Sequence, residues 1–374
     1  MKEIFVFMTS NTFCTLPPVK QLYNYIQKLY NTVVIESKIE TFEDYFINAD
    51  SNHIIYNYKS YDAYFKQPIL AKVIKHIKAL VYVLKLRFNY AGKNSKVYLY
   101  TFELYIIWLA IIFKTKNLFI IYHQFEMVIP DQINILDKFY LNYITKNWSK
   151  VDIAIFPERN RINYFKEIIF QFDESKFLLI PNSNNNFTNN SEKANNSKVR
   201  VVHIGALGIN HHINSLIEVL KILPEDKFEF YLIGNISEEI IDIINRLERP
   251  NVFTLPQVKH HELSEIYLTS DIGLILYQND SPNTIYCAPN KLYEFWSFGI
   301  PVIGDQLPGL KSVFKDSLQG MLVNMKDPNE LKNAILSLAS FEKSDNLRLK
   351  IYFNENFKLD LYLKKLETKL KELK

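Results

Sequence analysis

Cysteines, membrane-length apolar runs and export signals are scarce or missing in this chain. Its 374 residues include two cysteines, Cys14 and Cys287, and no Cys-x-x-Cys pair. This pattern excludes a disulfide framework and fits a reducing compartment. The longest apolar run, Leu104 to Phe113, is too short to cross a bilayer and predicts a buried helix. The first residues lack the basic region, apolar core and cleavage site of a signal peptide, so we expect a cytosolic protein.

A strong excess of charge and a metal-binding pattern are also missing. The net charge of +4 gives no general argument for nucleic acid as a partner. No Asp-x-Asp motif occurs, and no third ligand at suitable spacing accompanies His260 and His261, so we expect no metal site. Hydrophobic residues make up 48% of the chain, which supports full cores, and the length suits two domains.

A polar, asparagine-rich stretch divides the chain almost in half. Such a segment cannot bury a core, so it is interpreted as a linker over residues 183–198. It predicts an N-terminal domain over 1–182 and a C-terminal domain over 199–354. A last segment over 355–374 is periodic and rich in Leu and Lys, and we expect a helix that packs back towards the N-terminal domain.

Strand and helix patterns alternate on both sides of this linker. In the second half, strands are expected at 199–204, 228–233, 251–255, 272–277, 301–303 and 321–323, separated by helices from about 212, 237, 261, 290, 307 and 328. In the first half, strands are expected at 4–8, 33–35, 97–101, 118–122, 153–156 and 178–180. Continuous apolar strands alternating with helices predict an α/β protein with two Rossmann-like, doubly wound domains. The two domains would face a cleft, with ligands at the carboxyl ends of the strands.

The segment from Pro289 to Glu294 is the most informative part of the chain. It predicts a helix start, followed by a glycine stop at Gly299 and a buried strand. Lys291 and Glu294 are three residues apart and therefore share one helical face. A helix N-terminus can hold an anion, so a phosphate and a sugar-like pair of hydroxyls would suit this corner. An ordinary surface ion pair is the alternative interpretation.

The second half resembles the GT-B glycosyltransferases, specifically the family-4-like retaining group known as glycosyl transferases group 1. The matching segments are Val201–Gly208, Phe230–Gly234, Ser270–Leu274, Pro289–Glu294 with Gly299–Ile303, and Leu307–Leu310. The first half matches more weakly, through Tyr122–Glu126 and Ile180–Asn182. The resemblance implies transfer of a sugar from a UDP- or GDP-sugar, with retention and without a metal or other cofactor. The donor would lie mainly on the C-terminal domain and the acceptor mainly on the N-terminal one.

The resemblance also implies roles for particular residues of the second half. Glu294 is similar to the family glutamate that accepts hydrogen bonds from the ribose hydroxyls. The family comparison places Lys291 near the diphosphate, together with the backbone N–H groups of Asn290 to Leu292. Gly205 and Gly208 bracket a turn where the backbone can approach a phosphate closely. The resemblance adds His211 of the same loop to these donor-binding candidates.

In the first half, the candidate catalytic residues are His123 and Glu126. They follow an apolar strand and resemble the family segment that faces the donor sugar. The alternative is a structural histidine beside aromatic residues. In retaining enzymes of this kind the leaving phosphate can itself deprotonate the acceptor, so His123 is not assigned as a base.

The chain departs from the family pattern at two places. The loop after the strand over 199–204 usually carries an Arg and a Lys for the diphosphate, and here it reads Ile209-Asn210-His211-His212. Tyr286 stands eight residues before Glu294, where the family has a carboxylate. Three functions therefore stay open. They are a glycosyltransferase of bacterial surface polysaccharide, lipopolysaccharide or glycoprotein glycan synthesis, a sugar-nucleotide epimerase on the same architecture, and a non-catalytic partner protein.

The segment over 59–96 is locally basic, with apolar residues at helical spacing from Ile69 to Leu84. Such a helix can lie on an anionic membrane surface, and a solvated helix face is the alternative. Peripheral contact with the inner face of the cytoplasmic membrane would suit a lipid-linked sugar acceptor. His260 and His261 precede a helix, in a loop that in the family lies near the nucleotide base. Asp271 opens a strand and is interpreted as a structural cap.

Overall fold

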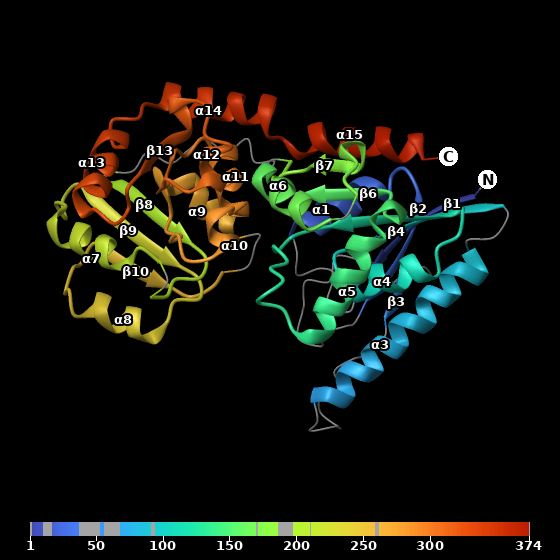
Figure 1. Cartoon of the computed structure of the whole chain (residues 1–374). Coiled ribbons are helices and arrows are strands. Elements are labelled where there is room, and N and C mark those ends of the chain that lie inside the picture. The colour runs from blue at the N-terminus through green and yellow to red at the C-terminus, as the bar shows by residue number, and fades with distance from the viewer. Residues whose placement is uncertain are drawn as a thin grey trace. The chain divides into compact units, whose positions relative to one another are not determined.

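The computed structural model describes residues 2–9, 17–36, 53–55, 68–90, 94–169, 171–185, 197–209, 211–258 and 262–373. These residues form two compact α/β units (Figure 1). The first unit comprises Met1–Pro157, Arg161–Ile180 and Tyr362–Lys374, and the second comprises Glu158–Asn160 and Pro181–Leu361.

The first unit is built on a seven-stranded sheet of order β3-β2-β1-β4-β5-β6-β7, in which the paired strands are parallel. All six residues of its strand LFIIYH are buried, as expected for a parallel sheet covered on both faces. Its elements are β1 (Lys2–Met8), α1 (Pro17–Ile26), β2 (Asn31–Glu36), β3 (His53–Ile55), α3 (Pro68–Lys85), η2 (Leu86–Tyr90), β4 (Ser95–Thr101), α4 (Leu104–Ile112), β5 (Leu118–His123), α5 (Ile135–Lys146), η3 (Trp148–Lys150), β6 (Ile153–Phe156), α6 (Arg159–Ile168), η4 (Glu174–Lys176) and β7 (Phe177–Leu179).

The second unit repeats this design with a six-stranded sheet of order β10-β9-β8-β11-β12-β13, again with parallel pairs. The strand order reverses direction between β8 and β11, so the crevice for a ligand is expected at their carboxyl ends. Its elements are β8 (Val199–Ile204), α7 (Ile213–Ile222), β9 (Phe228–Ile233), α8 (Glu238–Asn245), β10 (Val252–Leu255), α9 (Leu263–Thr269), β11 (Ile272–Ile275), α10 (Pro282–Ile285), α11 (Asn290–Ser297), β12 (Val302–Asp305), α12 (Pro308–Lys311), η5 (Ser317–Gln319), β13 (Gly320–Val323), α13 (Pro328–Leu338), α14 (Lys343–Asn356) and α15 (Leu359–Glu372), the last of which continues into the first unit.

Side chains that alternate along the strands of the second sheet pack into two separate hydrophobic cores. Val201 packs into the core beneath α7, α8 and α13, whereas the next residue, Val202, packs into the core beneath α9, α11, α12 and α14. Successive side chains of a strand point to opposite faces, so both layers of helices are held by the same strands. The predicted fold class, two doubly wound parallel α/β units with a long C-terminal helix, is confirmed.

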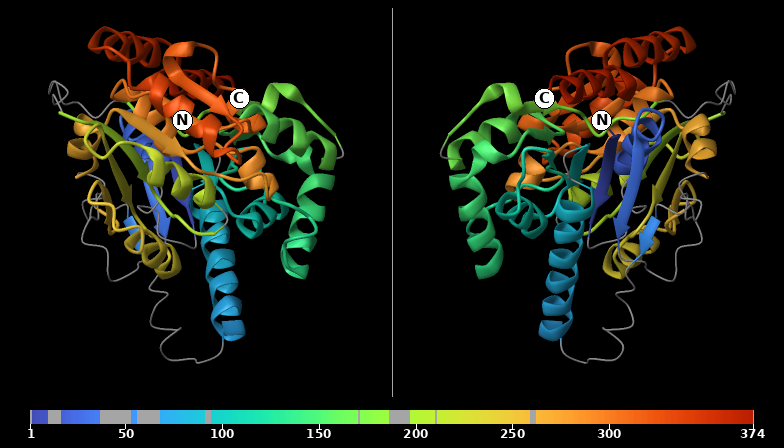
Figure 2. Two further views of the ribbon diagram at one scale, coloured as in Figure 1. Left: turned by 90° about the vertical axis from the view of Figure 1, so that its left-hand side faces the viewer. Right: turned by 90° about the vertical axis from the view of Figure 1, so that its right-hand side faces the viewer.

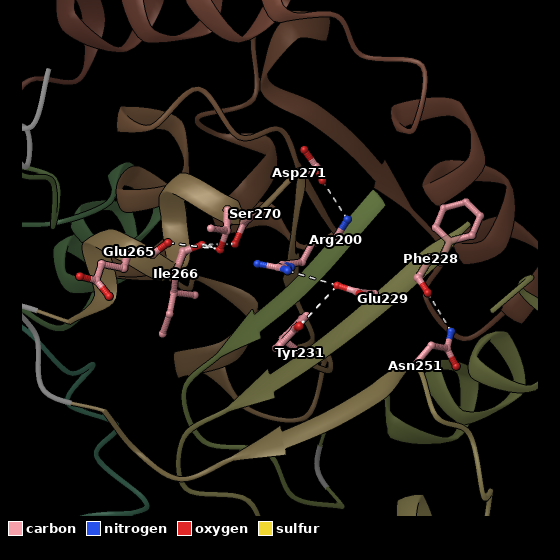
Figure 3. Close-up of polar contacts among 10 residues, drawn as sticks. Arg200, Phe228, Glu229, Tyr231, Asn251, Glu265, Ile266, Ser270 and Asp271 are labelled. Carbon is pink, nitrogen blue, oxygen red and sulfur yellow. Dashed lines mark hydrogen bonds and ion pairs between the residues drawn. The ribbon is translucent and has the colours of Figure 1, made fainter. Parts of the chain in front are cut away.

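A network of polar side chains links the amino ends of neighbouring strands in the second unit (Figure 3). Asp271 accepts a hydrogen bond from the backbone N–H of Arg200 at 2.8 Å, and the Arg200 guanidinium lies 3.2 Å from a carboxylate oxygen of Glu229. The hydroxyl of Tyr231 also approaches that oxygen, at 3.4 Å, and the Arg200 guanidinium lies over the Tyr231 ring. Asp271 therefore has a structural role at the amino ends of the strands, away from their carboxyl ends.

The C-terminal segment differs from the prediction of one helix from residue 355. Residues 355 and 356 instead close α14, and α15 starts at Leu359 (Figure 1). The interruption has a physical reason, because Phe357 is buried and the backbone N–H of Leu359 leaves the helix pattern to donate to the carbonyl of Asn184 at 3.0 Å. Further along α15, Glu367 accepts a 2.7 Å hydrogen bond from the hydroxyl of Tyr25 of α1.

Several elements were not predicted from the sequence. The three-residue strand β3 and the four-residue helix α10 are short, and α5 and α14 are weakly amphipathic, so packing decides these elements. Helix α6 is amphipathic and was missed although its pattern is clear. Residues 186–196 of the predicted linker lie outside the described residues, as do Asn210, His260 and His261.

Candidate functional site

The candidate site of the second unit lies where β8, β11 and β12 end and α11 begins. Gly205 follows β8 directly, and α11 starts at Asn290 after an extended Pro289 at its N-cap. The carboxyl ends of neighbouring parallel strands meet at one edge of the sheet, and this brings the predicted residues of the glycine turn and of α11 together.

Gly205 and Lys291 are in direct contact, although they are 86 positions apart in the sequence. Gly205 adopts φ 129°, which favours glycine, and a Cβ at this position would collide with Nζ of Lys291. Gly208 differs, because an added Cβ would meet nothing within 4 Å. Of the two glycines predicted for this turn, the structure therefore explains only Gly205.

Lys291 points into the site rather than out to solvent. Its ammonium lies 5.7 Å from the centroid of the Tyr277 ring, in a cation–π arrangement. Burial lowers the pKa of Lys291 to about 8, although the nearby carboxylate of Glu294 acts to raise it. A desolvated ammonium beside a helix N-terminus is poised for an anion that restores the lost solvation.

Glu294 is buried one turn further along α11. One of its carboxylate oxygens accepts a 2.5 Å hydrogen bond from the hydroxyl of Tyr267, which is also buried. The Tyr267 ring is fixed in turn between Phe295 and Phe298, at centroid distances of 5.2 Å and 5.0 Å. The sequence interpretation did not include Tyr267, and its only local signal is a polar aromatic on the apolar face of α9.

The loop between β8 and α7 is closed by short-range contacts. His211 accepts a hydrogen bond from the backbone N–H of Gly208 at 3.2 Å, and its backbone carbonyl accepts one from the Gln278 side chain. Burial first, and then the charge of Lys291, lowers the pKa of His211, so its imidazole is neutral at physiological pH. The structure thus places His211 beside Lys291, as a neutral group rather than a second cation.

His212 and Asp305 form a buried pair that sequence reasoning missed. His212 Nε2 lies 2.8 Å from an oxygen of Asp305, the last residue of β12, and so joins the loop after β8 to the loop after β12. Burial acts to raise the pKa of Asp305, but hydrogen bonds from His212 and from backbone N–H groups outweigh it and hold the pKa below its usual value. The pair therefore fixes the loop that carries His211 to the end of β12.

Tyr286 occupies the position where a carboxylate was expected. It caps the short helix α10, whose first turn is closed by a reciprocal capping box between Ser281 and Thr284. Tyr286 is partly buried, and its neighbour Cys287 is a buried free cysteine.

In the first unit, His123 ends β5 and Glu126 follows in the next loop. His123 is buried, its Nδ1 lies 2.8 Å from the hydroxyl of Tyr100, and its ring is 4.0 Å from that of Phe125. Its Nε2 is buried without a hydrogen-bond partner among the described residues. Burial lowers the pKa of His123 to about 3, so the ring is neutral, whereas the side chain of Glu126 is exposed. His123 alone of this pair therefore points inward.

Together, these groups of the second unit offer one cation, a helix N-terminus and a buried carboxylate within one turn of helix. A cation and backbone N–H groups suit a diphosphate, and a carboxylate can accept hydrogen bonds from two neighbouring hydroxyls. In the described part of the chain, no three His, Cys, Asp or Glu side chains are grouped so as to hold a metal ion.

Comparison with known proteins assigns this arrangement to a family. Residues 184–353, which contain the whole candidate site of the second unit, match the family model described as Glycosyl transferases group 1. Residues 184–353 of this chain therefore belong to the group 1 glycosyl transferases. The two sheets and the C-terminal helix accordingly form a GT-B fold, as the sequence resemblance predicted.

Two curated proteins are similar in sequence to part of this chain. An uncharacterized 41.2 kDa protein in the cps region of Klebsiella pneumoniae is 25% identical over 142 residues, which is 38% of this chain and 37% of that protein. A sulfoquinovosyl transferase of Arabidopsis thaliana is 22% identical over 141 residues, which is 38% of this chain and 26% of that protein. The matches thus span well under half of the length of either relative.

Among solved structures, the glycosyl transferase fold of this chain is similar to that of HepE from Anabaena in complex with UDP. The TM-score is 0.73 and the sequence identity 13%, over 99% of this chain and 100% of that one. HepE has also been solved with UDP-glucose, with a TM-score of 0.69 and 13% identity. At this identity the likeness establishes the fold.

Proposed function

We propose that this protein transfers a sugar from a UDP- or GDP-sugar to a glycan or lipid-linked acceptor, with retention, in bacterial surface polysaccharide or glycoconjugate synthesis. The observation that carries the proposal is the contact between Lys291 and Gly205, one helical turn from the buried carboxylate of Glu294. This is a cation for a diphosphate next to an acceptor for a ribose diol. The relative from a cps region and the UDP bound to the HepE structure support the same function.

In this proposal the donor diphosphate lies at the start of α11. Lys291 neutralises its charge, the backbone N–H groups of Asn290 to Leu292 bind its oxygens, and Glu294 holds the ribose. Gly205 lets the backbone approach the phosphates, and Gly208 and His211 line the same turn. The neutral His211 donates or accepts a hydrogen bond but adds no charge, so Lys291 carries the electrostatic task that an Arg and a Lys usually share.

The proposed chemistry is a front-face displacement. The bond between the anomeric carbon and the phosphate oxygen breaks, and a bond from the same carbon to the acceptor oxygen forms on the same face. The acceptor proton passes to the departing phosphate, whose charge Lys291 stabilises. No protein base is needed, which agrees with the low pKa of His123.

For the first unit, we propose that residues 1–182 bind the acceptor and that His123 contacts the donor sugar. Its neutral ring and its Nε2, which lacks a partner among the described residues, suit a hydrogen bond to a sugar hydroxyl. Glu126 is exposed in the following loop and is proposed as a second contact of this segment. A lipid-linked acceptor would bring the protein to the inner face of the cytoplasmic membrane.

The proposal is tested by nucleotide binding followed by donor turnover. UDP or GDP at millimolar concentration should raise the melting temperature, because a ligand of the folded state stabilises it by mass action. Glu294→Ala should reduce the shift markedly, because nucleotide binding weakens, while the variant stays folded. Screening UDP- and GDP-sugars for slow hydrolysis then identifies the donor. If neither nucleotide shifts the melting temperature, or if Glu294→Ala binds as the parent does, the proposed donor site is wrong.

A further inference from the structure

A stripe of apolar side chains lies exposed along α3 and η2. Ile77, Val81 and Phe88 are 54%, 43% and 70% exposed, at spacings of four and seven residues that place them on one side of the helical segment. The opposite side carries Ala79, Val83 and Leu86, which are buried in the core of the first unit. We call the exposed set, Ile77, Val81 and Phe88, the α3 stripe. Its members are not needed to hold the helix in place.

The charges carried by α3 and η2 themselves all have one sign. No Asp or Glu occurs in the sequence between Asp62 and Glu103, whereas Lys85 and Arg87 flank the stripe. Lys85 is exposed on the same side, and the Arg87 guanidinium lies 5.4 Å from the ring centroid of Phe88. Apolar side chains flanked by cations match the surface of an anionic lipid bilayer, in which negatively charged headgroups cover an apolar interior.

A second exposed apolar group stands on the first turns of α5. Ile135, Leu136 and Phe139 are 85%, 49% and 54% exposed. Helices α3 and α5 meet where the ring of His76 lies 5.9 Å from that of Tyr140. Both helices extend past the sheet of the first unit in the same direction (Figures 1 and 2). The apolar exposure therefore occurs on two neighbouring helices of this unit.

We propose that the α3 stripe docks the protein on the surface of an anionic lipid bilayer. In the described ranges no helix is both long and apolar enough to cross a membrane, so α3 would lie at the interface with Ile77, Val81 and Phe88 dipping between headgroups. Lys85 and Arg87 would meet the lipid phosphates. A second copy of this chain fits less well, because a symmetric contact through the stripe would set like charges against each other.

The proposal is tested by sedimentation of the full chain with vesicles. We expect binding to vesicles of phosphatidylglycerol and phosphatidylethanolamine, weak binding to pure phosphatidylcholine, and release at high salt. Replacing all three stripe residues, Ile77→Ser with Val81→Ser and Phe88→Ser, should lower the partition coefficient at least about tenfold. Lys85→Ala and Arg87→Ala should each lower it about fivefold.

A matched control is available on α14 of the second unit. Leu347 and Ile351 are 60% and 48% exposed at a spacing of four residues, and the double variant Leu347→Ser with Ile351→Ser should bind vesicles as the parent does. All variants replace exposed side chains, and an unchanged circular dichroism spectrum and melting temperature show that they fold. Unchanged vesicle binding by the triple variant overturns the proposal. So does a concentration-dependent dimer that the triple variant abolishes in the absence of vesicle binding, since this assigns the face to a second copy. Nucleotide binding is measured separately, so either result leaves the proposed donor site to its own test.

Discussion

Lys291 is the residue on which the electrostatics of the site depend. It stands where burial disfavours its charge, and its pKa falls to about 8. Among the described residues of the loop between β8 and α7, His212 is paired with Asp305, and burial lowers the pKa of His211, so neither histidine replaces the Arg and Lys that the family usually has there. Binding of a diphosphate should therefore depend on the protonation of this one amine.

Raising the pH should weaken UDP binding. The ammonium form binds the diphosphate and is lost above the pKa of about 8, so between about pH 7.5 and about pH 9.5 the dissociation constant should rise about twentyfold. Isothermal titration calorimetry measures this directly. Lys291→Arg is the control, because a guanidinium stays charged throughout and its profile should be flat. A flat profile for the parent protein would show that Lys291 does not meet the diphosphate.

Tyr267→Phe should loosen the recognition of ribose without removing the carboxylate. The hydroxyl holds one oxygen of Glu294 at 2.5 Å, and its loss leaves a buried acceptor without this donor, at a cost of about 1–3 kcal/mol in stability. We expect UDP affinity to fall about tenfold, equivalent to about 1.4 kcal/mol. The preference for UDP over 2′-deoxy-UDP should narrow in Tyr267→Phe and disappear in Glu294→Ala. An unchanged preference in Tyr267→Phe would limit Tyr267 to a packing role.

At the scale of elements, the turn after β8 and the start of α11 together form one candidate binding site. Each is an ordinary feature of a doubly wound sheet, a glycine after a strand and a helix N-terminus. Their contact through Gly205 and Lys291 makes them a site. The buried pair of His212 and Asp305 keeps the turn in register with the end of β12.

The two glycines of this turn should respond differently to the same substitution. Gly205→Ala introduces a Cβ that meets Nζ of Lys291, at a φ of 129° that alanine rarely adopts, so stability should fall by about 1–3 kcal/mol and UDP binding should be lost. Gly208→Ala has open space and should change stability by less than about 1 kcal/mol. Urea denaturation and UDP titration of both variants check this. Equal losses in the two variants would contradict the steric argument.

The elements themselves were predictable where their patterns were long and apolar. Strands over 153–156, 199–204 and 228–233 were predicted with the bounds found in the structure. The break between α14 and α15 was not, because it depends on a backbone hydrogen bond to Asn184, a residue far away in the sequence. Periodicity reports which face of an element is buried and says little about where a tertiary contact interrupts it.

At the scale of the whole molecule, two units with their own cores should respond unequally to the donor nucleotide. UDP at about a hundred times its dissociation constant stabilises the unit that binds it by about 2.7 kcal/mol. Hydrogen exchange should therefore slow in β8, β11 and the first turn of α11. Peptides of β1, β4 and β6 in the first unit should change little. Equal protection of both sheets would place the nucleotide elsewhere than proposed.

The sequence by itself determined the fold class, because continuous apolar strands alternating with helices have few stable arrangements other than parallel sheets covered on both faces. It also indicated the segment Pro289 to Glu294, since residue spacing alone sets which side chains share a helix face. Only the tertiary structure decided that Lys291 turns inward against Gly205 and that Tyr267 holds Glu294. These contacts join residues from different strands and helices, and their formation depends on how the chain packs, which no local pattern records.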